Sequence, residues 1–268
     1  MELLNALQWE IIEHLNRFGF LTGSQFQMLT GKSAGYLREM LGSLSKRGYV
    51  RSFRNNISHA IYTENMYVNM PLAVELLTSH KNIVQEEIRV ITTPYIVGDF
   101  YHRFNCVTTS LKLWSYLNTR NIPIRLMLSY FDKVGNPKKG TLTAKTAIPN
   151  GERKTIIPDI VLKTDKTLIL GEVYCDKNSQ RIVSQLGSYV YAIASGSPAD
   201  KFDIPHTNPF VLAVFQYPGI KQAVVKRLVN MSGFHSMAHL YFFATLDEVI
   251  QDCGSAWHTI TGEKLVFT

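Results

Sequence analysis

The sequence predicts a two-domain α/β (α+β) protein, with helices and a β-hairpin first and a mixed sheet flanked by helices second. In the first part, apolar residues recur at helical spacing. In the second part, short β-like runs alternate with helix-like runs. The length of 268 residues suits a small and a medium domain, and we expect domains 1–80 and 81–268.

Composition narrows the class of protein. Hydrophobic residues make up 46% and charged residues 18%, as in soluble globular proteins, and no apolar run approaches the ~20 residues of a membrane span. The first fifteen positions contain acids where a secretory signal has basic residues, so we expect a cytoplasmic protein without a membrane partner. The net charge of +7 favours a polyanionic partner. Cys106, Cys175 and Cys253 form no CxxC pair, which predicts neither a disulfide framework nor a thiolate zinc site.

The first domain begins with a predicted helix over 8–18, where apolar residues repeat along one helical face. We expect Ser24 to cap a short second helix, and a longer third helix to run from about Ser33 to Arg47. Two β-like runs around "RNNISH" then predict a hairpin. This is the order of elements in a winged helix-turn-helix, and "LSKRGYV" before the hairpin resembles many bacterial winged-helix proteins at that junction.

In that fold the third helix enters the major groove of DNA and the hairpin, or wing, lies along the backbone. Double-stranded DNA is therefore the expected partner of domain 1–80. A winged helix can also serve only for dimerisation or protein docking, and the clustered basic residues favour DNA. The positions expected to face DNA are Lys32, Ser33, Tyr36, Arg38, Lys46, Arg47, Arg51, Arg54 and Asn55.

The second domain has an orderly succession of elements. A strand is predicted over 123–130, after a helix over 103–118. Two further strands follow in "KTIIPDIVLK" and "TLILGEVY", joined by the turn "TDK". A helix over 178–194, a strand over 209–217, a basic helix and a last strand complete the chain. A strand reached through a helix is usually parallel to its neighbour, so we expect a mixed sheet.

Two acids occupy the paired strands: Asp159 follows Pro158 at the head of one, and Glu172 lies near the end of the next. With this order of elements, the acids resemble the motif of the PD-(D/E)XK nuclease superfamily. Gln185 and Tyr189 in the following helix match the QxxxY element of its RecB-like branch. A winged helix before such a domain further resembles the replication-relaxation proteins and the C-class plasmid mobilisation relaxases.

The resemblance implies a Mg²⁺- or Mn²⁺-dependent endonuclease that nicks plasmid or mobile-element DNA. Asp159, Glu172 and the carbonyl of Val173 would supply the oxygen ligands that these cations prefer. If the strand runs as far as Asp176, alternation places this residue on the face of Glu172 as a third metal ligand. The superfamily often has an acid in the first helix of the core. Here that helix contains none, and His102 opens it near the site.

The lysine that normally stands two residues after the second acid is replaced by Tyr174. Tyrosine donates a hydrogen bond but carries no positive charge at neutral pH. Lys177 could reach in from the start of the next helix, or Lys163 from the neighbouring strand. Tyr174 as a covalent nucleophile also stays open. The resemblance thus implies a catalytic set of Asp159, Glu172, Tyr174 and Lys177.

Other interpretations stay open from the sequence. A DNA-binding replication or mobilisation factor could keep the nuclease fold without its chemistry, and Tyr174 in place of lysine favours it. A restriction or repair nuclease would instead cut both strands or damaged DNA. The acids could also be ordinary solvent-facing residues, although Glu172 follows the apolar run "TLILG", where an unpaired acid would be expensive. The preferred DNA target is a plasmid origin of transfer, and a homodimer or accessory mobilisation proteins stay open as partners.

Overall fold

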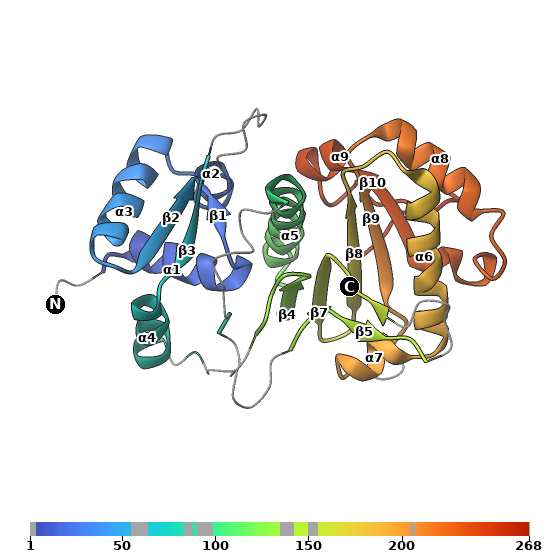
Figure 1. Ribbon diagram of the computed structural model, residues 1–268, viewed down its shortest axis with the longest axis horizontal. Helices are drawn as coiled ribbons and strands as arrows, with labels where there is room; N and C mark the ends of the chain where they lie inside the picture. Colours follow the sequence, from blue (N-terminus) through green and yellow to red (C-terminus); the bar gives the residue numbers. More distant parts are fainter. Residues whose placement is uncertain are drawn as a thin grey trace. The chain divides into compact units, whose positions relative to one another are not determined.

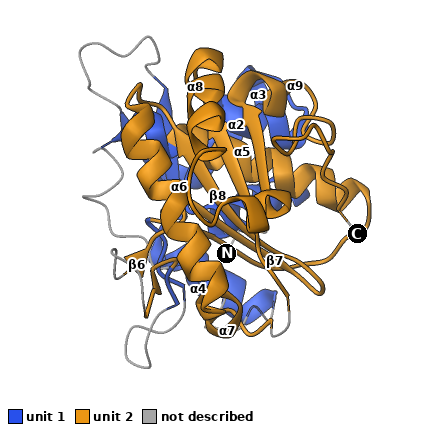
Figure 2. Cartoon of the chain, turned by 90° about the vertical axis from the view of Figure 1, so that its right-hand side faces the viewer, with its two compact units in different colours: residues 1–103, 131–143 blue, residues 104–130, 144–268 orange. Residues whose placement is uncertain are grey.

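The computed structural model of the chain describes residues 4–54, 64–81, 83, 88–89, 99–134, 142–149, 155–204 and 207–267. The chain divides into two compact units (Figure 2). One comprises Met1–Arg103 with Phe131–Thr143, and the other Phe104–Tyr130 with Ala144–Thr268. Helices precede and flank a mixed sheet, so the predicted α/β (α+β) class is confirmed.

The first unit combines helices with a three-stranded antiparallel sheet of order β1-β3-β2 (Figure 1). This is the arrangement of a winged helix-turn-helix, in which β2 and β3 form the wing. A further helix follows the wing and begins at a proline, whose fixed φ angle suits the first position of a helix. The elements are α1 (Ala6–Phe18), β1 (Leu21–Thr22), α2 (Gly23–Thr30), α3 (Ala34–Lys46), β2 (Val50–Arg54), β3 (Asn65–Asn69) and α4 (Pro71–His80).

The core of this unit comes from the apolar faces of α1 and α3. Ile11, Ile12 and Leu15 of α1 are fully buried, as is Leu44 of α3, and Leu37 is only 1% exposed. Their spacing puts them on one side of each helix, so the two helices pack through these faces. The opposite face of α3 is left to solvent.

Thr22, not Ser24, caps α2. The Thr22 hydroxyl accepts the N–H of Gln25 at 3.4 Å, and the Gln25 side chain accepts the N–H of Thr22 at 3.0 Å, a reciprocal capping box. The Ser24 hydroxyl instead donates to Glu64 at 2.7 Å, just before β3. The prediction was two residues late because Thr22 lies in the short strand β1, which no sequence pattern had indicated.

The segment after α4 belongs to the first unit, whereas the sequence placed the boundary near residue 80. The Arg89 N–H donates to the Asn16 side chain at 3.2 Å, and the Arg89 guanidinium forms a buried ion pair with Asp132. Arg89 also makes an isolated β-bridge with Val134. These partners are distant in sequence, so no local pattern predicted their association.

The second unit is built on a five-stranded sheet of order β10-β9-β8-β7-β4. Strands β8, β9 and β10 are parallel, and β7 is antiparallel to both β4 and β8. The mixed sheet expected from the helix connections is therefore confirmed. Its elements, in chain order, are α5 (Phe100–Thr119), β4 (Ile124–Ser129), β7 (Ile160–Thr164), β8 (Leu168–Tyr174), α6 (Ser179–Ala194), α7 (Ser197–Lys201), β9 (Phe210–Phe215), α8 (Pro218–Leu228), a 3-10 helix (His235–Leu240), β10 (Tyr241–Thr245) and α9 (Leu246–Gln251).

Strand β8 lies between β7 and β9, with α6 on one side of the sheet and α5 on the other (Figure 1). All seven of its residues are buried. Coverage of both faces explains why its sequence is a continuous apolar run and does not alternate.

Pro158 divides what the sequence predicted as one strand. β6 (Thr155–Ile156) pairs with β5 (Thr146–Ala147), and β7 starts only at Ile160. Proline has no N–H to donate to a ladder, so the chain changes partners at this point. Asp159 is thereby placed directly before the first residue of β7.

None of the helices in the described ranges combines the length and the apolar character that crossing a membrane requires.

Shortening a buried side chain of β8 should measure how much the stability of the second unit depends on packing around this strand. Leu170 is fully buried, with 0% exposure, so Leu170→Ala should lower the free energy of unfolding by about 3 kcal/mol. Val266→Ala, at a side chain that is 69% exposed, is the control and should change it by less than about 0.5 kcal/mol. Urea denaturation followed by circular dichroism makes the comparison. Equal effects of the two changes would contradict a packed core around β8.

Candidate functional site

Glu172 is a buried carboxylate near the end of β8, with 1% exposure. Its Oε2 accepts the side-chain N–H of Gln185 at 2.7 Å, and its Oε1 accepts the hydroxyl of Tyr189. Both donors come from α6, four residues apart, so one helix face presents them to the strand. A buried carboxylate needs such donors because it has lost its hydration. Glu172 is therefore not the solvent-facing acid of an ordinary hairpin.

Asp159 lies beside Glu172 at the neighbouring strand end and is 8% exposed. Ile160 pairs with Gly171, so the next positions outward on the two strands are Asp159 and Glu172. Asp159 Oδ2 accepts the N–H of Val173 at 2.8 Å, a hydrogen bond that crosses from the start of β7 to β8. The structure thus brings the two acids to the same end of two paired strands.

Tyr174 follows two residues after Glu172 and is buried. Burial raises the pKa of Tyr174 well above its usual value, and the charges of Glu172 and Asp159 raise it further. Burial and the charge of Glu172 likewise raise the pKa of Tyr189. Both phenols are neutral at neutral pH. The Tyr174 hydroxyl finds no hydrogen-bond partner in the described part of the chain. A protonated phenol is a weak nucleophile, which disfavours Tyr174 as the covalent nucleophile considered from the sequence.

A cavity of about 280 Å³ opens beside Glu172. Its wall includes Gln185 and Tyr189, which hold the carboxylate, together with the hydroxyl-bearing Ser188 and the cationic Arg181. Carboxylate, amide, hydroxyl and guanidinium groups therefore face one space. Such a lining suits a polar or charged ligand.

Asp176 is not the third carboxylate of this site. The prediction required the strand to continue to Asp176, but β8 ends at Tyr174 and the chain turns. One Asp176 oxygen accepts the N–H of Asn178 at 3.0 Å, and the other forms an ion pair with Arg181. Alternation stops where the strand stops, so Asp176 serves the turn into α6.

Neither lysine proposed to replace the missing one is directed at the acids. Lys163, toward the far end of β7, donates to the carbonyls of Phe202 at 2.6 Å and Asp203 at 2.7 Å. Lys177 is exposed, and its ammonium lies 5.1 Å from the ring centroid of Tyr217. These contacts correct the expectation that Lys163 or Lys177 supplies the charge that Tyr174 lacks.

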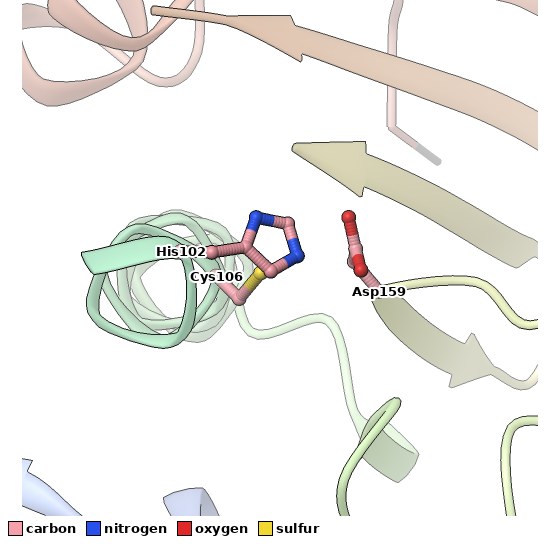
Figure 3. A group of neighbouring side chains, drawn as sticks. All are labelled: His102, Cys106 and Asp159. Atoms are coloured by element: carbon pink, nitrogen blue, oxygen red, sulfur yellow. The ribbon is translucent and has the colours of Figure 1, made fainter. Parts of the chain in front are cut away.

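A second group of potential metal ligands includes Asp159. His102, Cys106 and Asp159 each offer a ligand atom, and these atoms all lie within 4.8 Å of one another (Figure 3). It is the one such group of three or more that the described residues form. His102 and Cys106 are one turn apart on α5, and their side chains point toward the Asp159 carboxylate (Figure 3).

The sequence placed His102 near the site, and the structure brings it beside Asp159. Cys106 was not predicted, because only CxxC pairs of cysteines were considered as thiolate ligands. The spacing of His102 and Cys106 in a helix was the signal that could have found it. No disulfide involves any of the three cysteines, all of which are described.

The predicted DNA-facing residues gather on α3, its ends and the wing. Arg38 of α3 and Arg54 of β2 line a common cavity of about 470 Å³, so the helix and the wing present cations to one hollow. Asn55 lies outside the described residues. Of the remaining positions, Arg47 is half-buried and the exposed ones are Lys32, Ser33, Tyr36, Lys46 and Arg51.

Some of these side chains also have structural contacts. The Ser33 hydroxyl accepts the N–H of Tyr36 at 3.4 Å and caps α3. The guanidinium of Arg51 lies 4.9 Å from the ring centroid of Phe53. Arg51 is therefore held in place on the strand while it remains exposed.

A scan against models of known protein families finds no match. No curated protein matches the sequence. Among solved structures, the chain is similar to a crystal structure of a mutant MarR from E. coli, with 13% sequence identity and a TM-score of 0.27. That similarity covers 45% of this chain and 79% of the MarR chain.

Removal of one donor to Glu172 should reveal how far the buried carboxylate depends on α6. Tyr189→Phe leaves that oxygen without its hydroxyl donor, so the free energy of unfolding should fall by about 2 kcal/mol. Tyr191→Phe is the matched control, because Tyr191 lies on the same helix and is 52% exposed. Urea denaturation at neutral pH measures both. Equal stability of the two variants would mean that the hydroxyl of Tyr189 does not stabilise Glu172.

Proposed function

We propose that the chain is a metal-dependent DNA endonuclease of relaxase type, whose winged helix binds double-stranded DNA and whose second unit nicks one strand. The observation that carries the proposal is the pair of buried carboxylates, Asp159 and Glu172, at the same end of β7 and β8. They lie on a core of helix, three strands, helix and strand, the order of the PD-(D/E)XK nucleases. A plasmid or mobile-element origin of transfer as target rests on that resemblance alone.

The oxygen donors of the site suit Mg²⁺ or Mn²⁺. Asp159 and Glu172 would hold the cation with the carbonyl of Val173, and Mg²⁺ keeps several waters, so two carboxylates are enough. When bound, the cation would polarise a phosphoryl oxygen and activate water. Gln185 and Tyr189 would keep the Glu172 carboxylate in one orientation. The neutral Tyr174 hydroxyl offers a hydrogen-bond donor where these nucleases have lysine.

The first unit supports DNA as the substrate. Its fold is one that places a helix in the major groove, and two exposed cations lie there, Arg38 on α3 and Lys32 just before it. Arg51 and Arg54 continue the positive charge along the wing. Contact with both phosphate strands of a duplex requires cations on more than one element, and both the α3 region and the wing carry them.

Removal of cations from α3 and the wing should weaken DNA binding in a salt-dependent manner. We expect Arg38→Ala and Arg54→Ala each to lower affinity for duplex DNA and to reduce the slope of log K against log salt by roughly 1. Fluorescence anisotropy over a series of salt concentrations measures this. Arg125→Ala, which removes an exposed cation of β4 that is paired with Asp165, is the control. Equal slopes in all four proteins would exclude α3 and the wing as the contact surface.

Cleavage is tested with supercoiled plasmid that carries an origin of transfer, in the presence of Mg²⁺, Mn²⁺ or a chelator. The wild-type protein should nick it only with metal. Asp159→Asn and Glu172→Gln should abolish nicking and keep DNA binding, because both substitutions preserve the shape of the side chain and keep one of its two hydrogen-bond-accepting oxygens. Nicking that survives both substitutions would place the reaction elsewhere.

A non-catalytic DNA-binding replication or mobilisation factor is the second candidate. It is favoured by the positions of the lysines, since Lys163 is bound to two backbone carbonyls and Lys177 lies over Tyr217. Such a protein would bind DNA with the same salt dependence and would leave the plasmid intact under every metal condition.

A further inference from the structure

We infer that His102, Cys106 and Asp159 form a binding site for a thiophilic divalent transition-metal ion, with Zn²⁺ the ion that their donor set fits. Ligand atoms of all three lie within 4.8 Å of one another (Figure 3). The inference shares Asp159 with the proposed nuclease site and otherwise stands apart from it. It concerns binding of a metal and requires no cleavage.

The chemistry of the donors selects the metal. An imidazole nitrogen, a thiolate and a carboxylate are the three ligand types of protein zinc sites. Mg²⁺ prefers oxygen ligands throughout, and a thiolate favours softer ions. The thiolate and the carboxylate together balance the charge of a divalent ion. Three protein ligands also leave the fourth tetrahedral position to water or another small ligand.

The geometry is close to what Zn²⁺ requires. Bonds of roughly 2.0–2.3 Å separate tetrahedral ligand atoms by roughly 3.3–3.8 Å, so the present spacing closes by small side-chain rotations. The boundary between the two units falls within α5, after Arg103, and this continuous helix carries His102 and Cys106 together. A rigid helix therefore fixes two of the three ligands relative to each other.

The surroundings support a metal ligand role for Asp159 and Cys106. The N–H of Val173 donates to one Asp159 oxygen at 2.8 Å and orients the carboxylate. Groups that orient a ligand in this way are a usual part of metal sites. Cys106 is fully buried, whereas His102 is half-buried and gives solvent access to the cluster. The buried thiol of Cys106 beside the half-buried imidazole of His102 suits a site that a metal ion enters from the side of His102.

Co²⁺ is the probe that tests the site, because a cobalt–thiolate bond gives a charge-transfer absorption that oxygen and nitrogen ligands do not. Titration of the reduced full-length protein, without DNA, should produce this absorption and saturate at about one equivalent per chain. Zn²⁺ should then displace Co²⁺ and remove the band. His102→Ala should weaken Co²⁺ binding at least ~10-fold, since loss of a group that only orients a ligand already costs ~10–100-fold.

The three cysteines supply matched variants. Cys106→Ser should lose the charge-transfer band, and Cys253→Ser should keep it, because Cys253 is buried outside the cluster. Circular dichroism confirms that each variant is folded. Absence of the band in the wild-type protein would overturn the inference, and so would a band that persists in Cys106→Ser. Plasmid nicking is scored separately, so loss of nicking with an intact cobalt band would overturn the nuclease proposal alone.

Discussion

The burial of one carboxylate constrains the arrangement of the second unit. Glu172 is 1% exposed in a strand covered on both faces, and a charged group there is stable only with donors close by. Helix α6 supplies Gln185 and Tyr189 for this purpose. Because Ile182 and Leu186 of the same helix are fully buried, polar and apolar contacts agree on one orientation of α6 against the sheet. The acid thus helps to fix the rotation of the helix that covers it.

The same surroundings determine what Tyr174 can contribute. Burial and the charges of Glu172 and Asp159 raise its pKa, which favours the neutral phenol in the folded state. The unfolded tyrosine ionises near its usual value of about 10, so the stability that this group contributes is present below that pH and is lost as the pH rises above it. At neutral pH the Tyr174 hydroxyl can offer a hydrogen-bond donor to a ligand but supplies no charge. A bound metal ion or Arg181 could supply positive charge beside a phosphate, since Arg181 is the one cationic side chain among the described residues that line the cavity.

Periodicity and punctuation in the sequence were enough to predict the winged helix and the mixed sheet, and the resemblance to the nuclease superfamily placed Gln185 and Tyr189 near Glu172. These features depend on residues close together in the chain or on the regular direction of helix connections. The predictions that the structure contradicts all depended on where a strand ends or on contacts between residues far apart in the sequence. Asp176 was assigned to a strand that ends two residues earlier, and Lys163 proved to be held by the carbonyls of the two residues that follow α7. Cys106 meets Asp159 only because α5 and the start of β7 come together in the fold.

Asp159 stands between two sets of donors with different preferences for metals. With Glu172 it offers carboxylate oxygens, which suit a hard cation such as Mg²⁺. With His102 and Cys106 it completes a nitrogen, sulfur and oxygen set, which suits Zn²⁺. The N–H of Val173 already limits the orientation of the Asp159 carboxylate. A rotation that directs this carboxylate toward one donor set therefore directs it away from the other. If both proposals hold, Zn²⁺ bound on the α5 side would compete for Asp159 with the cation that cleavage requires, and the metal available would decide whether the chain cuts DNA or only binds it.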